Sequence, residues 1–206
     1  MDVRKPTSAA ELAELLRPHV ADARVLAAIA AVPRECFVPV RYRNQAYDNG
    51  PLPIGGGQTI SQPLVVARMC ELLALEGEDS VLDVGTGSGY HAAVLSLLCA
   101  HVWSIERDAA LADGARESLS AAGITNVTTV VGDGRLGMPE HAPYDAINVA
   151  AATPPIVVPA LTEQLAVGGR LVLPLATSDQ RLVLVRRGAE RITHEVYEAV
   201  KFVPLV

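Results

Sequence analysis

The stretch VLDVGTGSGYHAAVL, residues 81–95, decides the fold class. It joins a continuous apolar run that ends at Val84 to a helical pattern that begins near Ser88, with a glycine-rich turn between them. Glycines at such a turn let a ligand approach the backbone and leave the N–H groups of the helix pointing at it. A strand, a glycine loop and a helix in this order predict the first unit of a parallel α/β sheet.

The chain on both sides of this stretch extends the alternation of helices and strands. A helix is expected over about 61–75, and the apolar runs HVWSIE, NVTTVV, YDAINV and GRLVLPL follow with helical patterns between them. Their apolar residues are continuous, which is typical of a parallel sheet covered by helices on both faces. Two last strands, near 181–188 and 193–206, have no helix between them and are expected to pair antiparallel. We therefore expect a doubly wound, mostly parallel, seven-stranded sheet with an antiparallel edge.

Residues 1–206 are expected to form a single domain with two parts. In the first part, 1–60, Ser8 and Asp22 each precede a helical pattern and can cap it, and the Pro, Gly and Asn residues that follow predict loops. The second part, 61–206, carries the sheet and its glycine loop.

The composition indicates a well-packed protein without an electrostatic bias toward nucleic acid. Half of the residues are apolar, 19% are charged and the net charge is −6, with no Lys/Arg-rich run. Cys36, Cys70 and Cys99 lie far apart in apolar surroundings without a metal-binding spacing, so reduced thiols and no metal site are expected. No apolar stretch reaches the roughly 18 residues that span a bilayer, and the N-terminus has no apolar signal core. We expect a cytoplasmic monomer that binds neither nucleic acid nor membrane.

The glycines form a D-x-G-x-G-x-G pattern from Asp83 to Gly89. A nicotinamide or flavin fingerprint needs a small residue where this chain has Tyr90, so dinucleotide binding is disfavoured. The pattern resembles the one with which class I methyltransferases, a Rossmann-like fold, bind S-adenosylmethionine. A tight strand-to-helix turn that is merely rich in glycine is the alternative.

Acidic residues follow at the ends of the next two strands. Glu106 ends HVWSIE, where a carboxylate can accept both hydroxyls of an adenosine ribose. Asp133 stands between two glycines after VTTVV, where a carboxylate can accept the adenine amino group. Each residue also has an ordinary explanation, because Glu106 can be a solvated strand-end charge and Asp133 a turn residue. Polar sites at successive strand ends, in this order, favour an adenosine site.

The residues after the fourth strand disfavour methylation of a nucleic-acid base. An adenine N6 methyltransferase binds a flipped base by hydrogen bonds and stacking, through a [DNS]-P-P-[YFW] motif directly after that strand. Here the strand runs into Asn148 to Ala151, and the later Pro154-Pro155 has no aromatic residue after it. Cytosine C5 chemistry needs a nucleophilic cysteine, and none of the three cysteines lies in such a loop.

Segments along nearly the whole chain carry a family resemblance. They are VPRECFVP, AYDNGPLPIGGGQTISQP, VLDVGTGSGY, GDGRLGMPEHAPYDAI, GGRLVLPL and the final FVPL. Together they resemble the protein-L-isoaspartate (D-aspartate) O-methyltransferase family, and LPIGGGQTISQP weighs most because the general methyltransferase fold has no such segment. The resemblance implies methyl transfer from S-adenosylmethionine to the free α-carboxylate of L-isoaspartyl residues in damaged proteins or peptides. S-adenosyl-L-homocysteine is then the product, and the ester collapses to a succinimide.

The same resemblance implies roles for individual residues. Ser61 takes the family's active-site serine position, and Thr59 and Ile60 lie in the segment that covers cofactor and substrate. The family's cofactor-binding positions fall on Asp83, Gly85, Thr86, Ser88, Gly89, Glu106, Asp133 and Gly134.

Ser61 also has an interpretation that needs no family. It lies two residues before Pro63 and ahead of an apolar helical pattern, so it is expected to be the N-cap of that helix. A helix N-terminus with a free hydroxyl attracts a carboxylate. Because such carboxylates titrate near about pH 4, the acceptor needs no general base, and Ser61 is expected to orient it. His91 is expected to pack and not to react.

Two places depart from the family pattern. The segment 150–155 is one residue longer than usual, and Gln180 matches a family glutamine in an otherwise different loop, which leaves its role open. Two alternatives to a repair enzyme also stay open. One is a carboxyl methyltransferase that acts on a dedicated peptide aspartate in a biosynthetic pathway, and the other is a cofactor-binding relative without catalysis.

Overall fold

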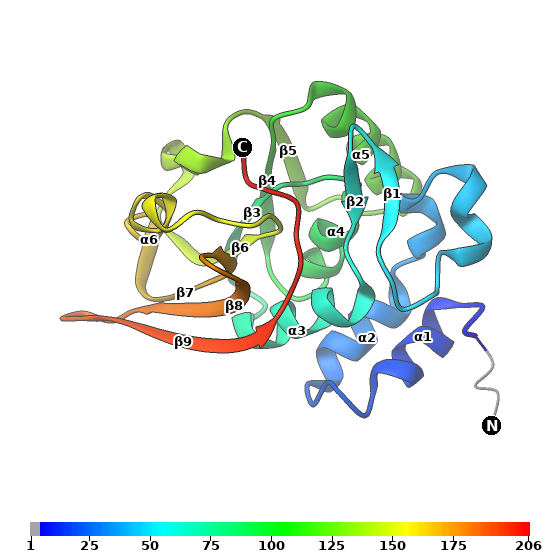
Figure 1. The fold of residues 1–206 in the computed structure, drawn as a ribbon, viewed down its shortest axis with the longest axis horizontal. Coiled ribbons are helices and arrows are strands. Elements are labelled where there is room, and N and C mark those ends of the chain that lie inside the picture. Colours follow the sequence, from blue (N-terminus) through cyan, green and yellow to red (C-terminus); the bar gives the residue numbers. More distant parts are fainter. Residues whose placement is uncertain (1–4) are drawn as a thin grey trace.

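The computed structural model describes residues 5–206 and has a seven-stranded sheet at its centre (Figure 1). The strands lie in the order β5-β4-β3-β6-β7-β8-β9, so β3, which precedes the glycine loop, is in the interior of the sheet. The pairings from β5 to β7 are parallel, and the β7–β8 and β8–β9 pairings are antiparallel, which confirms the predicted sheet. The strands are β3 (Ser80–Val84), β4 (His101–Glu106), β5 (Val127–Val131), β6 (Tyr144–Val149), β7 (Leu165–Ala176), β8 (Gln180–Arg187) and β9 (Ile192–Ala199).

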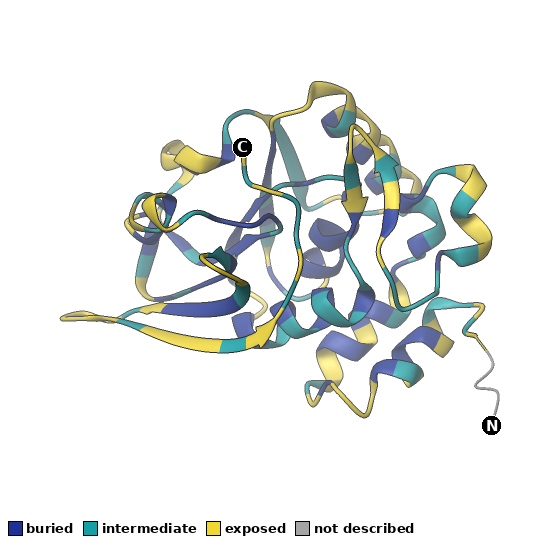
Figure 2. Ribbon diagram, viewed as in Figure 1, coloured by how far each residue is buried: buried dark blue, intermediate teal, exposed yellow. Residues whose placement is uncertain are grey.

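Helices cover both faces of this sheet, and the two layers differ in thickness. On one face, Val81 and Val102 pack in a core that includes residues of the three helices covering this face and of the two N-terminal helices. On the other face, Leu82 and Ile147 pack with the short helix α6 (Val158–Thr162). The central strands are therefore buried between the layers, as their continuous apolar runs predict (Figure 2). The helices of the thicker layer are α3 (Pro63–Leu73), α4 (Tyr90–Ser96) and α5 (Ala109–Ala121).

Two further helices, α1 (Ala9–Leu16) and α2 (Ala23–Ala31), form the N-terminal part of the fold. Helix α2 packs on α3 and α4, and α1 packs on α2 (Figure 1). Ser8 and Asp22 cap them, since each side chain accepts a hydrogen bond from a backbone N–H of the first turn. Both predicted caps are confirmed. Residues 1–4, with which the expected N-terminal part starts, lie outside the described residues.

A separate two-stranded hairpin precedes Ser61. It consists of β1 (Leu52–Gly55) and β2 (Gln58–Ile60), which pair antiparallel. Gly56 in its turn has a φ of 57°, a conformation that favours glycine. A Cβ on Gly56 would lie 3.5 Å from Asp108 Oδ2, so the turn lies against the start of α5.

The start of α3 corrects one prediction. Ser61 is not the N-cap, because the helix begins at Pro63 and the N-cap position is Gln62, whose side chain makes no capping hydrogen bond. Asn49 Oδ1 instead accepts the hydrogen bond from Leu64 N, at 3.1 Å. A residue from the loop before the hairpin thus satisfies this helix end, and the Ser61 hydroxyl is not used for capping.

The three cysteines form no disulfide among residues 5–206. Cys36, Cys70 and Cys99 are all free thiols, and the last two are buried. Within residues 5–206, no helix combines the length and the apolar character needed to cross a membrane.

Candidate active site

The glycine loop joins β3 to α4 at the carboxyl ends of the parallel strands. Gly85, Gly87 and Gly89 have φ values of 91°, 53° and 89°, which favour glycine. Gly89 also has to be small for packing, because a Cβ there would lie 3.3 Å from side-chain atoms of Ala115 and Leu119 on α5. Gly85 and Gly87 instead line a cavity. Only part of the glycine motif therefore faces open space.

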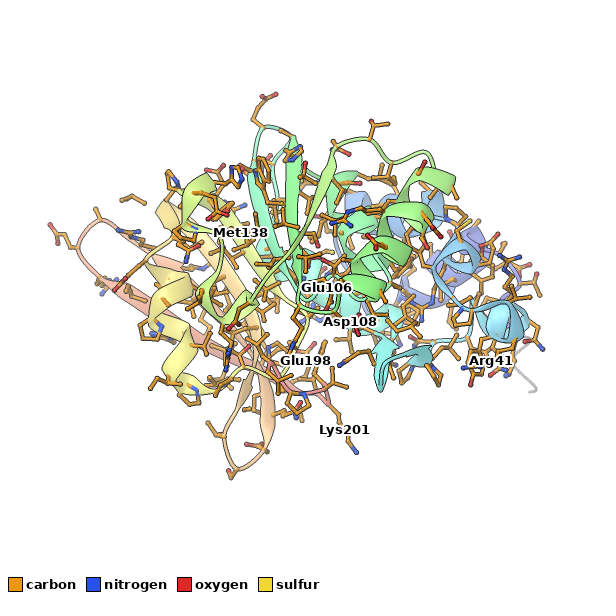
Figure 3. The ribbon with its side chains drawn as sticks, turned by 90° about the horizontal axis from the view of Figure 1, so that it is seen from above. Arg41, Glu106, Asp108, Met138, Glu198 and Lys201 are labelled. Carbon is orange, nitrogen blue, oxygen red and sulfur yellow. The ribbon has the colours of Figure 1, made fainter. Side chains whose placement is uncertain are left out.

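Glu106 ends β4 beside this loop and close to Asp108 (Figure 3). The residue is 8% exposed, and each carboxylate oxygen accepts one backbone hydrogen bond. Oε2 accepts from Gly87 N at 2.9 Å, and Oε1 accepts from Asp108 N at 3.1 Å. Each oxygen keeps a further lone pair, so the two together can accept from a pair of ligand hydroxyls. The carboxylate lines the same cavity as the two glycines.

This strand-end cavity is narrow, at about 70 Å³. Because ligand pockets measure roughly 300–1,000 Å³, a nucleoside requires its walls to move apart. Two walls lie outside the large sheet: the hairpin residues Gln58 and Thr59, and the chain end 203–206. The other lining residues are Val84, Gly85, Gly87, Ile105, Glu106, Arg107, Gly134, Ala150 and Ala151.

A second space of about 380 Å³, the Ser61 cleft, adjoins the strand-end cavity. Thr59, Ala150 and Val203 line both spaces and so mark the boundary between them. Two ligands, one in each space, would meet at these three residues. Direct transfer of a group between two molecules requires this adjacency. The remaining residues that line the Ser61 cleft are Pro51, Ser61, Gln62, Val65, Ala199, Val200, Lys201 and Phe202.

The chain end, residues 200–206, forms a strap that runs from β9 past both spaces (Figure 1). Gln180 holds this C-terminal strap with both ends of its amide. Its Oε1 accepts from Phe202 N at 2.7 Å, and its Nε2 donates to Phe202 O at 3.2 Å. Ala152 adds two backbone hydrogen bonds further along the strap, at 2.8 and 2.9 Å. Gln180, whose role the sequence left open, therefore fixes a shared wall of the two spaces.

Asp83 lines neither space, because it is fully buried beneath the glycine loop. Its oxygens accept hydrogen bonds from Ser104 Oγ and Asn148 Nδ2, both at 2.7 Å, and Thr86 Oγ1 lies 2.6 Å from Ser104 Oγ. Burial raises the pKa of Asp83 to about 6, while the two hydrogen bonds oppose the rise. These side chains connect the ends of β3, β4 and β6 behind the loop. Asp83 and Thr86 thus support the loop from below.

His91 belongs to the same buried network. Burial lowers the pKa of His91 to about 3, so the ring is neutral at neutral pH. Because Nδ1 accepts from Asn148 Nδ2 at 3.2 Å, the ring proton lies on Nε2, which is 3.6 Å from Cys70 Sγ. This placement agrees with the expectation that His91 packs and does not react.

Three predicted residues, Ile60, Ser88 and Asp133, lie near the strand-end cavity without lining it. Asp133 pairs with Arg135, whose Nη2 lies 2.6 Å from Oδ2, and this hydrogen bond lowers the pKa of Asp133. The neighbouring Gly134 does line the cavity. For Asp133 to accept an adenine amino group, its carboxylate has to turn from Arg135, so this role stays a prediction.

Several lining residues were not selected from the sequence. Arg107 and Ala150 directly follow strands β4 and β6, so the rule that ligands bind at the carboxyl ends of parallel strands would have found them. Gln58 lies in the family segment but next to the selected Thr59. The C-terminal strap includes the family segment FVPL, but the sequence placed it in the last strand, near 193–206, whereas β9 ends at Ala199. Its place beside the two spaces was not predicted, because it depends on how β8 and β9 fold back.

The sheet order, the glycine loop and the two adjoining spaces define a class I methyltransferase. Comparison with known families then identifies the group within that class. The family model for protein-L-isoaspartate(D-aspartate) O-methyltransferase matches residues 8–206. The chain therefore belongs to the protein-L-isoaspartate (D-aspartate) O-methyltransferase family.

Similar proteins have the same family name. The protein-L-isoaspartate O-methyltransferase of Vibrio vulnificus strain YJ016 is 51% identical over 187 residues, which cover 91% of this chain and 89% of that protein. The protein-L-isoaspartate O-methyltransferase of Methanoregula boonei is 52% identical over 188 residues, which cover 91% of this chain and 86% of that protein. A solved protein-L-isoaspartate O-methyltransferase superposes with a TM-score of 0.84 at 29% identity, covering 94% of this chain and 64% of that one. A Plasmodium falciparum structure in complex with S-adenosyl-L-homocysteine, 23% identical, covers 97% and 98% with a TM-score of 0.82 and supports the fold.

Proposed function

We propose that this protein transfers a methyl group from S-adenosylmethionine to the α-carboxylate of L-isoaspartyl residues in damaged proteins or peptides. Family membership over residues 8–206 supports the reaction and the methyl donor. One observation carries the proposal: the strand-end cavity and the Ser61 cleft meet at Thr59, Ala150 and Val203. The backbone nitrogen of the following residue attacks the carbonyl carbon of the methyl ester, and the methoxy group leaves as methanol with the proton of that nitrogen. This step closes the succinimide and starts the repair, whereas an ionised carboxylate has no comparable leaving group.

The residues of the strand-end cavity fit this methyl donor. Glu106 offers two oxygens that can accept from the ribose hydroxyls, and Gly85 and Gly87 place no side chain between backbone and ligand. When bound, S-adenosylmethionine supplies a methyl group that its sulfonium charge has already activated. We assign Glu106 to the ribose and the glycines to the close backbone approach.

Ser61 acts on the acceptor by orientation. Ser61 lines the second space, its hydroxyl is not used to cap α3, and a hydroxyl there can donate to one oxygen of the substrate carboxylate. The other oxygen is then free to attack the methyl carbon. Because the acceptor is ionised at neutral pH, no side chain has to remove a proton.

The walls of the Ser61 cleft keep water away from the acceptor. Val65, Val200 and Phe202 give the cleft apolar sides, and a nucleophilic carboxylate gains reactivity as water is stripped from it. Among residues 5–206, Lys201 is the only charged residue that lines this cleft, and it is exposed and extends away from the centre of the molecule (Figure 3). The acceptor therefore meets a hydroxyl inside the cleft and a cation only at its rim.

The test is methyl transfer from labelled S-adenosylmethionine to two synthetic peptides that differ only in an isoaspartyl or an aspartyl linkage. We expect turnover of the isoaspartyl peptide alone. Ser61→Ala loses one hydrogen bond to a charged group, so kcat/KM is expected to fall by about 10- to 150-fold. The matched control is Ser120→Ala on the exposed side of α5, which leaves kcat/KM unchanged.

Two other outcomes refute the proposal. Turnover of the aspartyl peptide would indicate an enzyme for a dedicated peptide aspartate. Binding of S-adenosylmethionine without transfer to either peptide would indicate a relative that has lost catalysis.

A further inference from the structure

Arg34 is a fully buried cation that has no carboxylate partner within the described part of the chain, residues 5–206. It lies in a short 3-10 helix, Arg34–Phe37, and is 0% exposed. None of the ion pairs among residues 5–206 includes it. Burial lowers the pKa of Arg34 to about 10, so the guanidinium stays charged at neutral pH. A buried charge is costly unless other groups compensate it, and arginine is rarely buried to this extent.

The compensation comes from one segment of the chain. Nε donates to Ala46 O at 2.7 Å, Nη1 to Ser61 O at 3.0 Å, and Nη2 to Gly50 O at 3.2 Å. Each nitrogen of the guanidinium thus holds a different carbonyl group of residues 46–61. This segment includes the hairpin and ends at the residue that we assign to the acceptor.

Arg34 also contacts the helix that follows the glycine loop. Its guanidinium carbon lies 4.8 Å from the centre of the Tyr90 ring, and Tyr90 is the first residue of α4. A cation over an aromatic face is attracted to it. One side chain therefore connects the segment that carries Ser61 to the element that carries the methyl donor's loop.

Packing and hydrogen bonds fix other points of this segment. Ala46, Leu52 and Ile60 are buried in the larger core, and the Tyr47 hydroxyl donates to Glu35. Asn49 fixes a further point through Leu64 N, which lies after Ser61 in the chain. Arg34 holds the Ser61 carbonyl itself, so its guanidinium contributes directly to the position of the Ser61 backbone.

We propose that Arg34 is a positioning residue for methyl transfer, which holds Ser61 in place relative to the glycine loop. The inference rests on the proposed function of Ser61. Arg34 lines neither the strand-end cavity nor the Ser61 cleft, so it acts through Ser61 and does not touch the substrate. Lysine replaces it only in part, because a single Nζ keeps the charge but does not reach three separate carbonyl groups in a fixed fork.

The test compares Arg34→Met and Arg34→Lys with Arg170→Met, a matched control. Arg170 also donates to two backbone carbonyls, Leu73 O at 2.7 Å and Ala74 O at 3.0 Å, but at the far end of α3. It lines neither space, and it pairs with Asp79. Its loss destabilises the fold without freeing Ser61.

The readouts are kcat and KM for the isoaspartyl peptide, binding of S-adenosyl-L-homocysteine, and amide hydrogen exchange. For Arg34→Met we expect kcat/KM to fall by at least tenfold, with the affinity for S-adenosyl-L-homocysteine changed by less than about threefold. Amide exchange is expected to accelerate within residues 46–61. Arg34→Lys should lie between Arg34→Met and the wild type, and Arg170→Met should match the wild type in kcat/KM.

Two results would overturn the inference. In one, Arg34→Met keeps the kcat/KM of the wild type, or loses kcat/KM and ligand affinity by the same factor, which would indicate a purely structural residue. In the other, exchange within residues 46–61 stays as in the wild type. The exchange experiment needs no turnover, so it tests whether Arg34 holds residues 46–61 in place even without activity. If the wild type failed to methylate the isoaspartyl peptide, that result would refute the proposed function and not the contacts of Arg34.

Discussion

Replacing Glu106 by Gln tests the strand-end cavity directly. The substitution keeps the size of the side chain, removes its charge and turns one acceptor oxygen into an NH₂ donor. That nitrogen would face either Gly87 N or Asp108 N, which donate to the carboxylate at 2.9 and 3.1 Å. One backbone donor and one ligand hydroxyl would therefore lose their acceptor.

The change in affinity follows from the ligand hydroxyl alone. The lost bond to the backbone weakens the free and the bound protein alike, so it largely cancels in the binding free energy. A hydrogen bond to a charged group contributes about 1.5–3 kcal/mol. We therefore expect the Kd for S-adenosyl-L-homocysteine to rise by about 10- to 150-fold.

Isothermal titration calorimetry with S-adenosyl-L-homocysteine measures this change. Glu117→Gln, on the exposed side of α5, makes the same change of charge away from the cavity and should bind as the wild type does. A Kd for Glu106→Gln within about threefold of the wild type, with the variant folded, would refute the assignment of Glu106 to the ribose.

Two further predictions concern stability. A Cβ on Gly134 would lie 2.5 Å from Val84 Cγ1, so Gly134→Ala should lower the free energy of unfolding by about 1–3 kcal/mol and Tm by several degrees. The control is Gly114→Ala in α5, where a Cβ meets no atom within 4 Å and the free energy of unfolding should rise by up to about 1 kcal/mol. Equal changes in Tm for the two variants would contradict this prediction. The pKa of His91 is lowered from 6.5 to about 3, so the unfolded state binds the extra proton and stability is lost as the pH falls through this window. Urea unfolding measures the free energy of unfolding of the wild type and of His91→Gln at several pH values. Between pH 6.5 and about 3, the free energy of unfolding of the wild type should fall relative to that of His91→Gln by up to about 1.4 kcal/mol per pH unit. If the difference in unfolding free energy between the two proteins did not change with pH, the buried ring would not be neutral.

The sheet was predictable because a strand that is buried on both faces has a continuous run of apolar residues, which is visible in a short stretch of sequence. Strands such as β3 and β6 read as continuous apolar runs, and the missing helix between β8 and β9 predicts their antiparallel pairing. The family segment likewise directed attention to Ser61, which lines the second space, and its role toward an acceptor stays a prediction. These features depend on residues close together in the chain.

The predictions that were wrong or stayed open concern features that depend on residues far apart in the sequence. The cap of α3 comes from Asn49, 15 positions before Leu64, so a local pattern wrongly assigned it to Ser61. Asp83 and Glu106 both look like acidic strand-end residues, but only Glu106 is the last residue of its strand and lines the cavity. Sequence spacing cannot separate these two cases, because burial depends on how neighbouring strands are aligned.

The shared boundary at Thr59, Ala150 and Val203 has a thermodynamic consequence. A ligand that displaces these residues from one side changes the wall that the other ligand contacts, and the two binding equilibria are then linked. Linkage is reciprocal: if the methyl donor changes the affinity for the acceptor peptide by some factor, the peptide changes the affinity for the donor by the same factor. Measuring the affinity for each ligand with and without the other therefore tests whether the two spaces act as one cooperative unit.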